Sequence, residues 1–400
     1  METLQSALAH LRLGPMSTSG NLAVFPLEST NEEDPHFLLL GEAMARYGAK
    51  VVERGAERGG ATVGRIVFHN KAPLDVLLLD GEELRGGLQN RVVNKSILVP
   101  AHTELEIPVS CVERGRWSRE AHGGALRRRR ARSTENKPPL PPFAFGPTDP
   151  GPREPSPTHE QEARRSAPPS WVPGCSCPAC LDALERSGVA PLDRMKEQDL
   201  SPDTDDLDGF FLGSRLPSDL LRYKASLLSR AFGRHAGPRS TPPGVQSAVW
   251  DGIERKMRRM RVRSHTSAMS DIYQQRSSTL AEMAAALRPA ACQVGAAFPI
   301  DGKLVGVEVI GCRAAYEKIH DKIIHSYAID AIETYQPNAV PPPPSAEQVT
   351  HFLRVLGQAP CHFVPGVGKG LDVSIGNDGL TALGLVDGER LIHLAAFPTH

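Results

Sequence analysis

The chain has 400 residues, in which 46 lysines and arginines balance 46 aspartates and glutamates. At the usual ~100–200 residues per domain this length predicts roughly two domains. The neutral charge argues against a protein that binds nucleic acid or a membrane surface as a whole. The sequence has neither the ~18 consecutive apolar residues of a membrane span nor the basic start and apolar centre of a signal peptide. We therefore expect a cytoplasmic protein without a membrane partner.

Residues 18–118 are predicted to form a strand-rich region around one helix. The segment Phe37–Gly48 carries apolar residues at helical spacing, and Gly48 is placed to cap that helix. Period-two alternation or a continuous apolar run predicts four strands, at Leu22–Leu27, Thr62–Asn70, Leu74–Leu79 and Glu104–Cys111. Because strands dominate, we expect a small sandwich or barrel.

Residues 119–243 differ in composition from the regions on either side. A nearly pure arginine run at Arg127–Arg132 leads into a tract rich in proline and serine that reaches Pro173. Such a composition buries too little apolar surface to offset the entropy lost on ordering, so we expect a largely disordered insert. The leucines of Leu216–Phe232 predict one helix within it. We interpret the arginine run as a solvated charge cluster rather than a nucleic-acid site.

Residues 244–400 are predicted to alternate blocks of helix with blocks of strand. Apolar stripes predict three helices, at Val249–Met260, Ser270–Leu287 and Ala314–Glu333. The pairs Asp301–Gly302 and Asp387–Gly388 predict two hairpins. The expected fold class is α+β, in which the strand-rich N-terminal region packs with a C-terminal region of helices and hairpins, and a long, mostly disordered insert interrupts the fold.

A polar corner follows the apolar strand that ends at Leu79. Six polar residues lie within it, and they are Glu82, Glu83, Gln89, Asn90, Arg91 and Asn94. As a site, Glu82 or Glu83 would act as a catalytic acid or base, Arg91 would clamp a phosphate or carboxylate, and the amides would bind the ligand. As a purely structural turn, Arg91 would instead pair with Glu82 or Glu83. The spacing alone leaves both interpretations open.

A second polar group stands at the end of the strand Glu104–Cys111. Cys111 is on the inward face of that strand, so we expect a buried, unreactive thiol. Glu113, Arg116 and Trp117 leave the strand together. Trp117 could stack on a base or simply cover the end of the strand. In the first case, all three residues would belong to a ligand site with the polar corner.

The insert contains a triplet of cysteines, Cys175, Cys177 and Cys180. Thiols at this spacing resemble half of a structural zinc site, which His159 or His235 could complete. The second C-x-x-C that such sites commonly use does not occur, which favours a surface cysteine cluster without metal and leaves zinc as the alternative. Zinc is therefore a possible cofactor, and the core fold does not need it.

The segment Leu77–Trp117 also carries a longer signature, which runs D-G-E-E-L-x-G, Q-N-R, N-x-S-x-L-V-P and I-P-V-S-C-V-E-x-G-R-W. This pattern resembles the ARPP domain family, named for association with ADP-ribosylglycohydrolases and with rhodanese/phosphatase-superfamily proteins. Later segments, among them VWDGIERKM and QVGAAFPIDGKLVGVEV, are similar to the same family. The resemblance covers most of residues 20–118 and 244–335, which leaves the insert outside it.

What the resemblance implies about function is a role near ADP-ribose, NAD or related nucleotides. We therefore expect the polar corner to bind or process a nucleotide-like ligand. The expected binding residues are Gln89, Asn90, Arg91, Asn94, Glu113, Arg116 and Trp117. The alternative is a non-catalytic interaction or structural module. Its partner proteins would then perform the chemistry, and the resemblance implies that these are ADP-ribosylation-related proteins.

Overall fold

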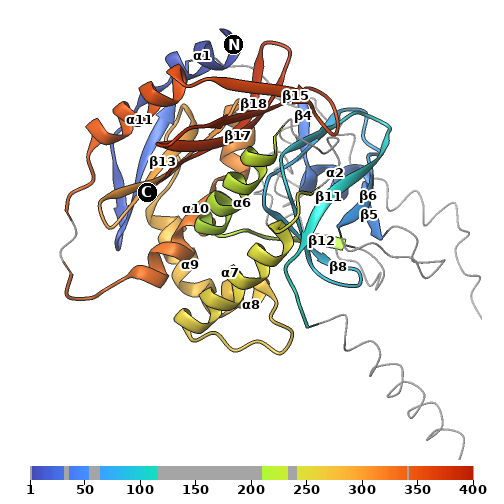
Figure 1. The fold of residues 1–400 in the computed structure, drawn as a ribbon, viewed down its shortest axis with the longest axis horizontal. Coiled ribbons are helices and arrows are strands. Elements are labelled where there is room, and N and C mark those ends of the chain that lie inside the picture. The colour runs from blue at the N-terminus through green and yellow to red at the C-terminus, as the bar shows by residue number, and fades with distance from the viewer. Residues whose placement is uncertain are drawn as a thin grey trace, which may run out of the picture. The chain divides into compact units, whose positions relative to one another are not determined.

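The computed structural model describes residues 2–30, 36–53, 64–115, 210–232, 241–339 and 342–399. All of these residues fall into one compact unit made of residues 1–118 and 196–400 (Figure 1). None of the described helices is long and apolar enough to span a membrane. The arginine run Arg127–Arg132 lies outside the described residues.

The largest described sheet is antiparallel and contains nine strands, in the order β1-β3-β13-β14-β18-β17-β16-β15 with β2 beside β3. The β13–β14 turn has positive φ angles at both Asp301 and Gly302, as a tight hairpin requires, which confirms that prediction. N-terminal and C-terminal segments thus share one sheet. Its strands are β1 (Arg12–Leu13), β2 (Ser17–Ser19), β3 (Leu22–Glu28), β13 (Gln293–Ile300), β14 (Lys303–Ile310), β15 (Cys361–Pro365), β16 (Leu371–Gly376), β17 (Leu380–Asp387) and β18 (Arg390–Pro398).

Helices cover both faces of this sheet, because the inner strands are apolar on both sides. Along β18, Ala395 and Phe397 belong to one core, whereas Leu394 and Ala396 belong to the other. In Figure 1, α6 lies against β17 and α10 against β13. The first core is completed by α6 (Ser218–Ala231), α7 (Val245–Met260), α8 (Met269–Gln275), α9 (Ser277–Ala286) and α10 (Arg313–Thr334). The second core is completed by α1 (Glu2–Ala9) and α11 (Ala346–Gln358).

Two smaller sheets of the strand-rich N-terminal region enclose a third core, in agreement with the predicted α+β class. One sheet has the order β10-β7-β4 and the other β12-β8-β9-β11-β6-β5. Together with α2 (Leu40–Tyr47) they comprise β4 (Phe37–Leu39), β5 (Lys50–Glu53), β6 (Arg65–His69), β7 (Asp75–Leu78), β8 (Glu82–Gly86), β9 (Arg91–Val93), β10 (Ile97–Val99), β11 (Glu104–Cys111) and β12 (Phe210–Arg215).

Three details differ from the elements expected from the sequence. The first residues of Phe37–Gly48 form β4, which pairs in parallel with β7, before α2 begins; Gly48 does cap α2 with a φ of 61°. The segment Ser270–Leu287 forms two helices, because the chain breaks at Arg276, whose guanidinium donates to the Met260 carbonyl at 2.8 Å. Strand β12, which composition assigned to the insert, pairs with β8 in the core.

Candidate active site

The polar corner predicted from the sequence is divided between the two faces of β8. Successive side chains of a strand point to opposite faces. Glu82 therefore accepts from Lys322 Nζ of α10 at 2.5 Å, whereas Glu83 accepts from the backbone N–H of Ser214 at 3.0 Å. Both carboxyl groups are buried. The two residues expected to be catalytic thus have separate partners and do not meet at one site.

Arg91 of β9 lies opposite Leu84 of β8 and pairs with a residue that the sequence analysis did not consider. Its guanidinium, which is fully buried, donates to Glu53 at 3.3 Å and to the Gln89 side chain at 3.2 Å. The predicted structural pairing of Arg91 with Glu82 or Glu83 is wrong, because Glu53 of β5 is its partner. The fold therefore encloses this guanidinium.

Some of the other predicted site residues lie near Arg91, and others lie outside the residues that the structure describes. The backbone N–H of Asn90 donates to Glu113 at 3.2 Å, and the Asn90 side chain accepts from the Gly86 N–H at 3.1 Å. Cys111 is buried, and burial raises the pKa of its thiol to about 11, as expected for an unreactive cysteine. The remaining predicted residues, Arg116, Trp117, Cys175, Cys177 and Cys180, lie outside the described residues.

Asn94 belongs to a different group, which surrounds a buried lysine. Its side chain donates to Thr241 at 2.8 Å and accepts from Ser110 at 2.8 Å. Its carbonyl accepts from Lys224 Nζ at 3.0 Å, and Lys224 also forms an ion pair with Asp80. Burial lowers the pKa of Lys224, against the opposing effect of Asp80. This network therefore joins the signature segment to α6.

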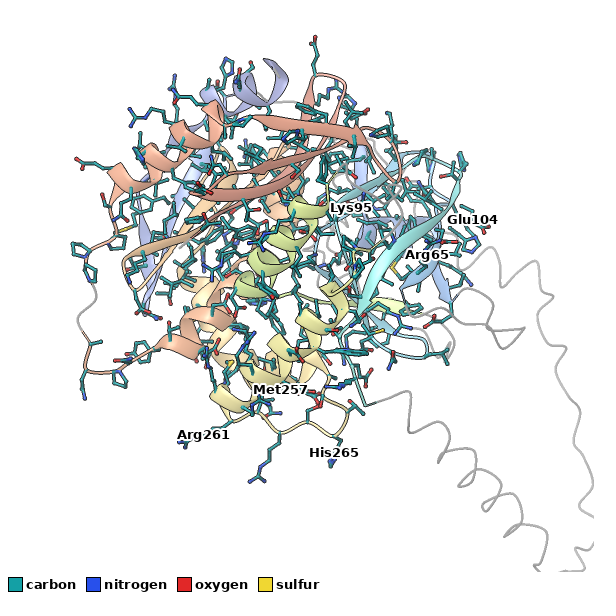
Figure 2. All side chains as sticks on the ribbon, in the orientation of Figure 1. Arg65, Lys95, Glu104, Met257, Arg261 and His265 are labelled. Atoms are coloured by element: carbon teal, nitrogen blue, oxygen red, sulfur yellow. The ribbon has the colours of Figure 1, made fainter. Side chains whose placement is uncertain are left out.

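A narrow cavity of about 80 Å3 opens beside this network. Its lining combines the end of α6 with parts of β16, β17 and β18. Lys95, labelled in Figure 2 near α6, pairs with Asp372 of β16. The polar lining residues include Asp80, Asn94, Lys95, Ser96, Asp372 and His393. Asn94 is thus the one predicted ligand-binding residue among the lining residues.

Ser96, His393 and Glu308 form a continuous chain of hydrogen bonds from the cavity into the core. Ser96 Oγ lies 2.7 Å from His393 Nδ1, and His393 Nε2 lies 3.3 Å from Glu308 Oε2. Glu308 of β14 pairs in register with Ala395, so His393, two residues earlier on β18, shares its face of the sheet. The backbone N–H of Asp80 donates to Ser96 Oγ at 3.0 Å and fixes the hydroxyl.

Arg215 keeps the far end of this chain negatively charged. Its guanidinium donates to Glu308 Oε1 at 2.7 Å, where Tyr327 also donates at 3.1 Å. Burial alone would raise the pKa of Glu308, but Arg215 and the hydrogen bond from His393 lower it to about 2. An ionised Glu308 can only accept, which assigns the imidazole proton to Nε2. His393 Nδ1 is then the acceptor for the Ser96 hydroxyl.

A family model, described as the ARG and Rhodanese-Phosphatase-superfamily-associated Protein domain, matches residues 10–137 and 213–397. The chain belongs to this ARPP family. Ser96, Arg215, Glu308 and His393 all lie within the matched segments. No curated protein and no solved structure matches the chain.

Sequence reasoning missed most of this ARPP-domain site, although part of it was in view. Asp80 and Ser96 stand in the signature that carried the resemblance, yet only the denser corner between them was interpreted as a site. Glu308 and His393 are single polar residues in apolar strands more than 200 positions away. A charged residue inside a strand that is apolar on both faces was the available signal, because such a group needs a buried partner.

The ARPP domain also gathers three carboxylates, from Asp219, Asp330 and Glu333, within reach of one another. Lys256 Nζ already lies among them, at 2.6 Å from Asp330 and 3.2 Å from Asp219, and it also pairs with Glu333. The ammonium group therefore supplies the positive charge that this cluster needs.

A second cavity in the ARPP domain is larger, at about 420 Å3. It is lined by residues around the start of α10 and by the β17–β18 turn. Lys369, which is half exposed, pairs there with Asp75 and Asp387 at 3.0 Å each. The site residues predicted from the sequence are not among its lining residues.

Proposed function

We propose that this protein is a hydrolase in which Ser96 is the nucleophile and His393 the general base. The proposal is supported by the 2.7 Å contact between Ser96 Oγ and His393 Nδ1 beside a cavity, with the other imidazole nitrogen held by an ionised carboxylate. A nucleophile bonded to a base, and a base oriented by a third group, are the parts of a catalytic triad, which is recognised by geometry rather than by chain order.

Each residue has a distinct part in the proposed reaction. His393 takes the Ser96 proton as Oγ attacks a carbonyl carbon, and it later returns that proton to the leaving group. Glu308 stabilises the imidazolium and fixes its tautomer, and it acts as a positioning residue because it does not line the cavity.

Labelling with a fluorophosphonate probe tests this proposal. We expect the wild-type protein to be labelled at Ser96, as located by peptide mass spectrometry, because a serine activated by a base displaces fluoride from phosphorus. Ser96→Ala and His393→Gln should abolish labelling. Ser229→Ala, which removes a half-buried α6 hydroxyl that lies 2.8 Å from the Ser374 hydroxyl, should leave it unchanged. A protein that stays unlabelled, or labelling that persists in Ser96→Ala, would contradict the proposal.

A nucleotide-like ligand, such as ADP-ribose or NAD, is the second candidate, and the larger cavity favours it. At ~15 Å3 of cavity per small atom, about 420 Å3 has room for roughly 28 atoms, which is enough for the ADP part that these two ligands share. Lys369 offers such a ligand a cationic group at the cavity surface.

We expect ADP-ribose or NAD to raise the melting temperature of the wild-type protein, because a ligand that binds only the native state stabilises it by ~2.7 kcal/mol at about 100 times its dissociation constant. Lys369→Ala should lose most of this shift while folding normally. Lys303→Ala, an exposed lysine at the opposite end of β14 from the cavity, should retain it. If neither ligand shifts the melting temperature, the larger cavity does not bind these nucleotides. The alternative of a non-catalytic interaction module is then favoured.

A further inference from the structure

The charges that line the smaller cavity are all satisfied by the protein itself. Lys95 is paired with Asp372 and Asp80 with Lys224, while His393 uses its two imidazole nitrogens for Ser96 and Glu308. A phosphate or carboxylate entering this cavity would have to break one of these pairs to gain a counter-charge, and separating a buried pair is strongly unfavourable. The part of a ligand that enters the cavity is therefore expected to be uncharged.

The rest of the lining is apolar and comes from several elements. Residues at the end of α6 and at Thr241–Pro242 line the cavity together with residues of the large sheet. The apolar lining residues include Leu228, Phe232, Pro242, Val364, Val373 and Leu383. Polar groups without a hydrogen-bond partner are costly on such a surface, whereas each buried CH2 group stabilises binding by ~0.8 kcal/mol.

The size of the cavity limits the length of the group that it can hold. One water needs ~10–15 Å3 of such a cavity, so about 80 Å3 has room for roughly five to eight small atoms. A four-carbon acyl group fits this space, while an eight-carbon chain exceeds it. A whole nucleotide exceeds it several-fold.

We infer that the substrate of Ser96 carries a short, uncharged, apolar acyl group of about four carbons, joined through an ester bond. The inference rests on the proposed hydrolase function. In the first step the Ser96 Oγ bonds to the carbonyl carbon, the ester C–O bond breaks, and the proton passes through His393 to the departing alcohol. In the second step water gives a proton to His393 and bonds through its oxygen to the carbonyl carbon, the bond from that carbon to Ser96 Oγ breaks, and His393 returns the proton to Oγ, which releases the carboxylic acid and restores Ser96.

Turnover of p-nitrophenyl esters with acetyl, butyryl, octanoyl and hemisuccinyl groups tests the inference. We expect kcat/KM for the butyryl ester to exceed that for the acetyl ester about 15-fold, which is two CH2 groups at ~0.8 kcal/mol each. The octanoyl ester should react more slowly than the butyryl ester because it overfills the cavity. The hemisuccinyl ester, which has a similar length but carries a carboxylate, should fall at least about tenfold below butyryl.

A pair of neighbouring leucines on α6 provides a matched control. Leu228 lines the cavity, whereas Leu227, which is also half-buried, packs against the core and is not a lining residue. Leu228→Ala should add room for two or three carbons and raise the ratio of kcat/KM for hexanoyl over butyryl esters about tenfold. Leu227→Ala should leave this ratio unchanged, even where its stability is lower.

The outcomes separate failure of this inference from failure of the proposed function. If acetyl or hemisuccinyl esters react fastest while Ser96 is still labelled by the fluorophosphonate, the acyl preference is wrong and the hydrolase proposal stands. Labelling of Ser96 with no turnover of any ester would also overturn the inference. If no ester reacts and Ser96 is not labelled, both are wrong.

Discussion

Arg215→Met is expected to destabilise the protein by ~3–5 kcal/mol, the usual range when one partner of a buried ion pair is removed. Arg215 and Glu308 are both fully buried, and the 2.7 Å contact between them is what keeps Glu308 ionised in the core. Methionine has a similar length but no charge, so Glu308 would have to stay ionised without its counter-ion or take up a proton. Urea denaturation at pH 7 measures the loss.

The comparison with an exposed pair isolates the effect of burial. Arg65 and Glu106 also approach to 2.7 Å, but the Arg65 side chain is 41% exposed on β6, where Figure 2 labels it. Arg65→Met should therefore cost below ~1 kcal/mol. Adding Glu308→Gln to Arg215→Met should recover ~1–3 kcal/mol, because it removes the unpaired charge. Equal losses for Arg215→Met and Arg65→Met would contradict a special role for the buried pair.

Local sequence patterns were sufficient for the elements whose signals are short-range. The hairpin at Asp301–Gly302 needs only two residues that tolerate positive φ, and α10 has Tyr316, Ile319, Ile323 and Tyr327 at helical spacing. The elements that differed depend on distant partners. Strand β4 exists because β7 lies beside it, and the break at Arg276 is accompanied by a bond to Met260. Neither partner can be inferred from local periodicity.

The same distinction applies to the candidate site. Period-two alternation places Glu82 and Glu83 on opposite faces of any strand, so their separation could have been predicted from the sequence. The contact of Ser96 with His393 could not have been predicted, because it depends on tertiary packing that brings the residue before β10 against β18. The dense polar motif therefore indicated the segment that contains Ser96. Which side chains of that segment reach the cavity depends on tertiary packing.

Glu83→Gln is expected to change the pH dependence of stability. Burial raises the pKa of Glu83 from 4.5 to about 7, against the opposing hydrogen bond from the Ser214 N–H. Between pH 4.5 and 7 the unfolded chain releases this proton while the folded protein keeps it, so wild-type stability falls as the pH rises through this window. A difference of about 2.5 pKa units corresponds to ~3 kcal/mol. Glutamine does not titrate, so the variant should gain ~3 kcal/mol relative to wild type between pH 4.5 and pH 8.

Measuring wild type and variant together is essential, because Glu83 is not the only carboxyl group with a raised pKa. Desolvation and the neighbouring Asp330 also raise the pKa of the half-buried Asp219 to about 7, and that contribution cancels only in the difference between the two proteins. Glu104→Gln, an exposed site on β11, gives the effect of the same substitution outside the core and should stay below ~0.5 kcal/mol. If the difference between Glu83→Gln and wild type is the same at pH 4.5 and pH 8, then the pKa of Glu83 is the same in the folded and unfolded states, and Glu83 is ionised in the folded core at pH 8. In that case its Oε1, which has no hydrogen-bond partner among the described residues, must be solvated by buried water rather than protonated.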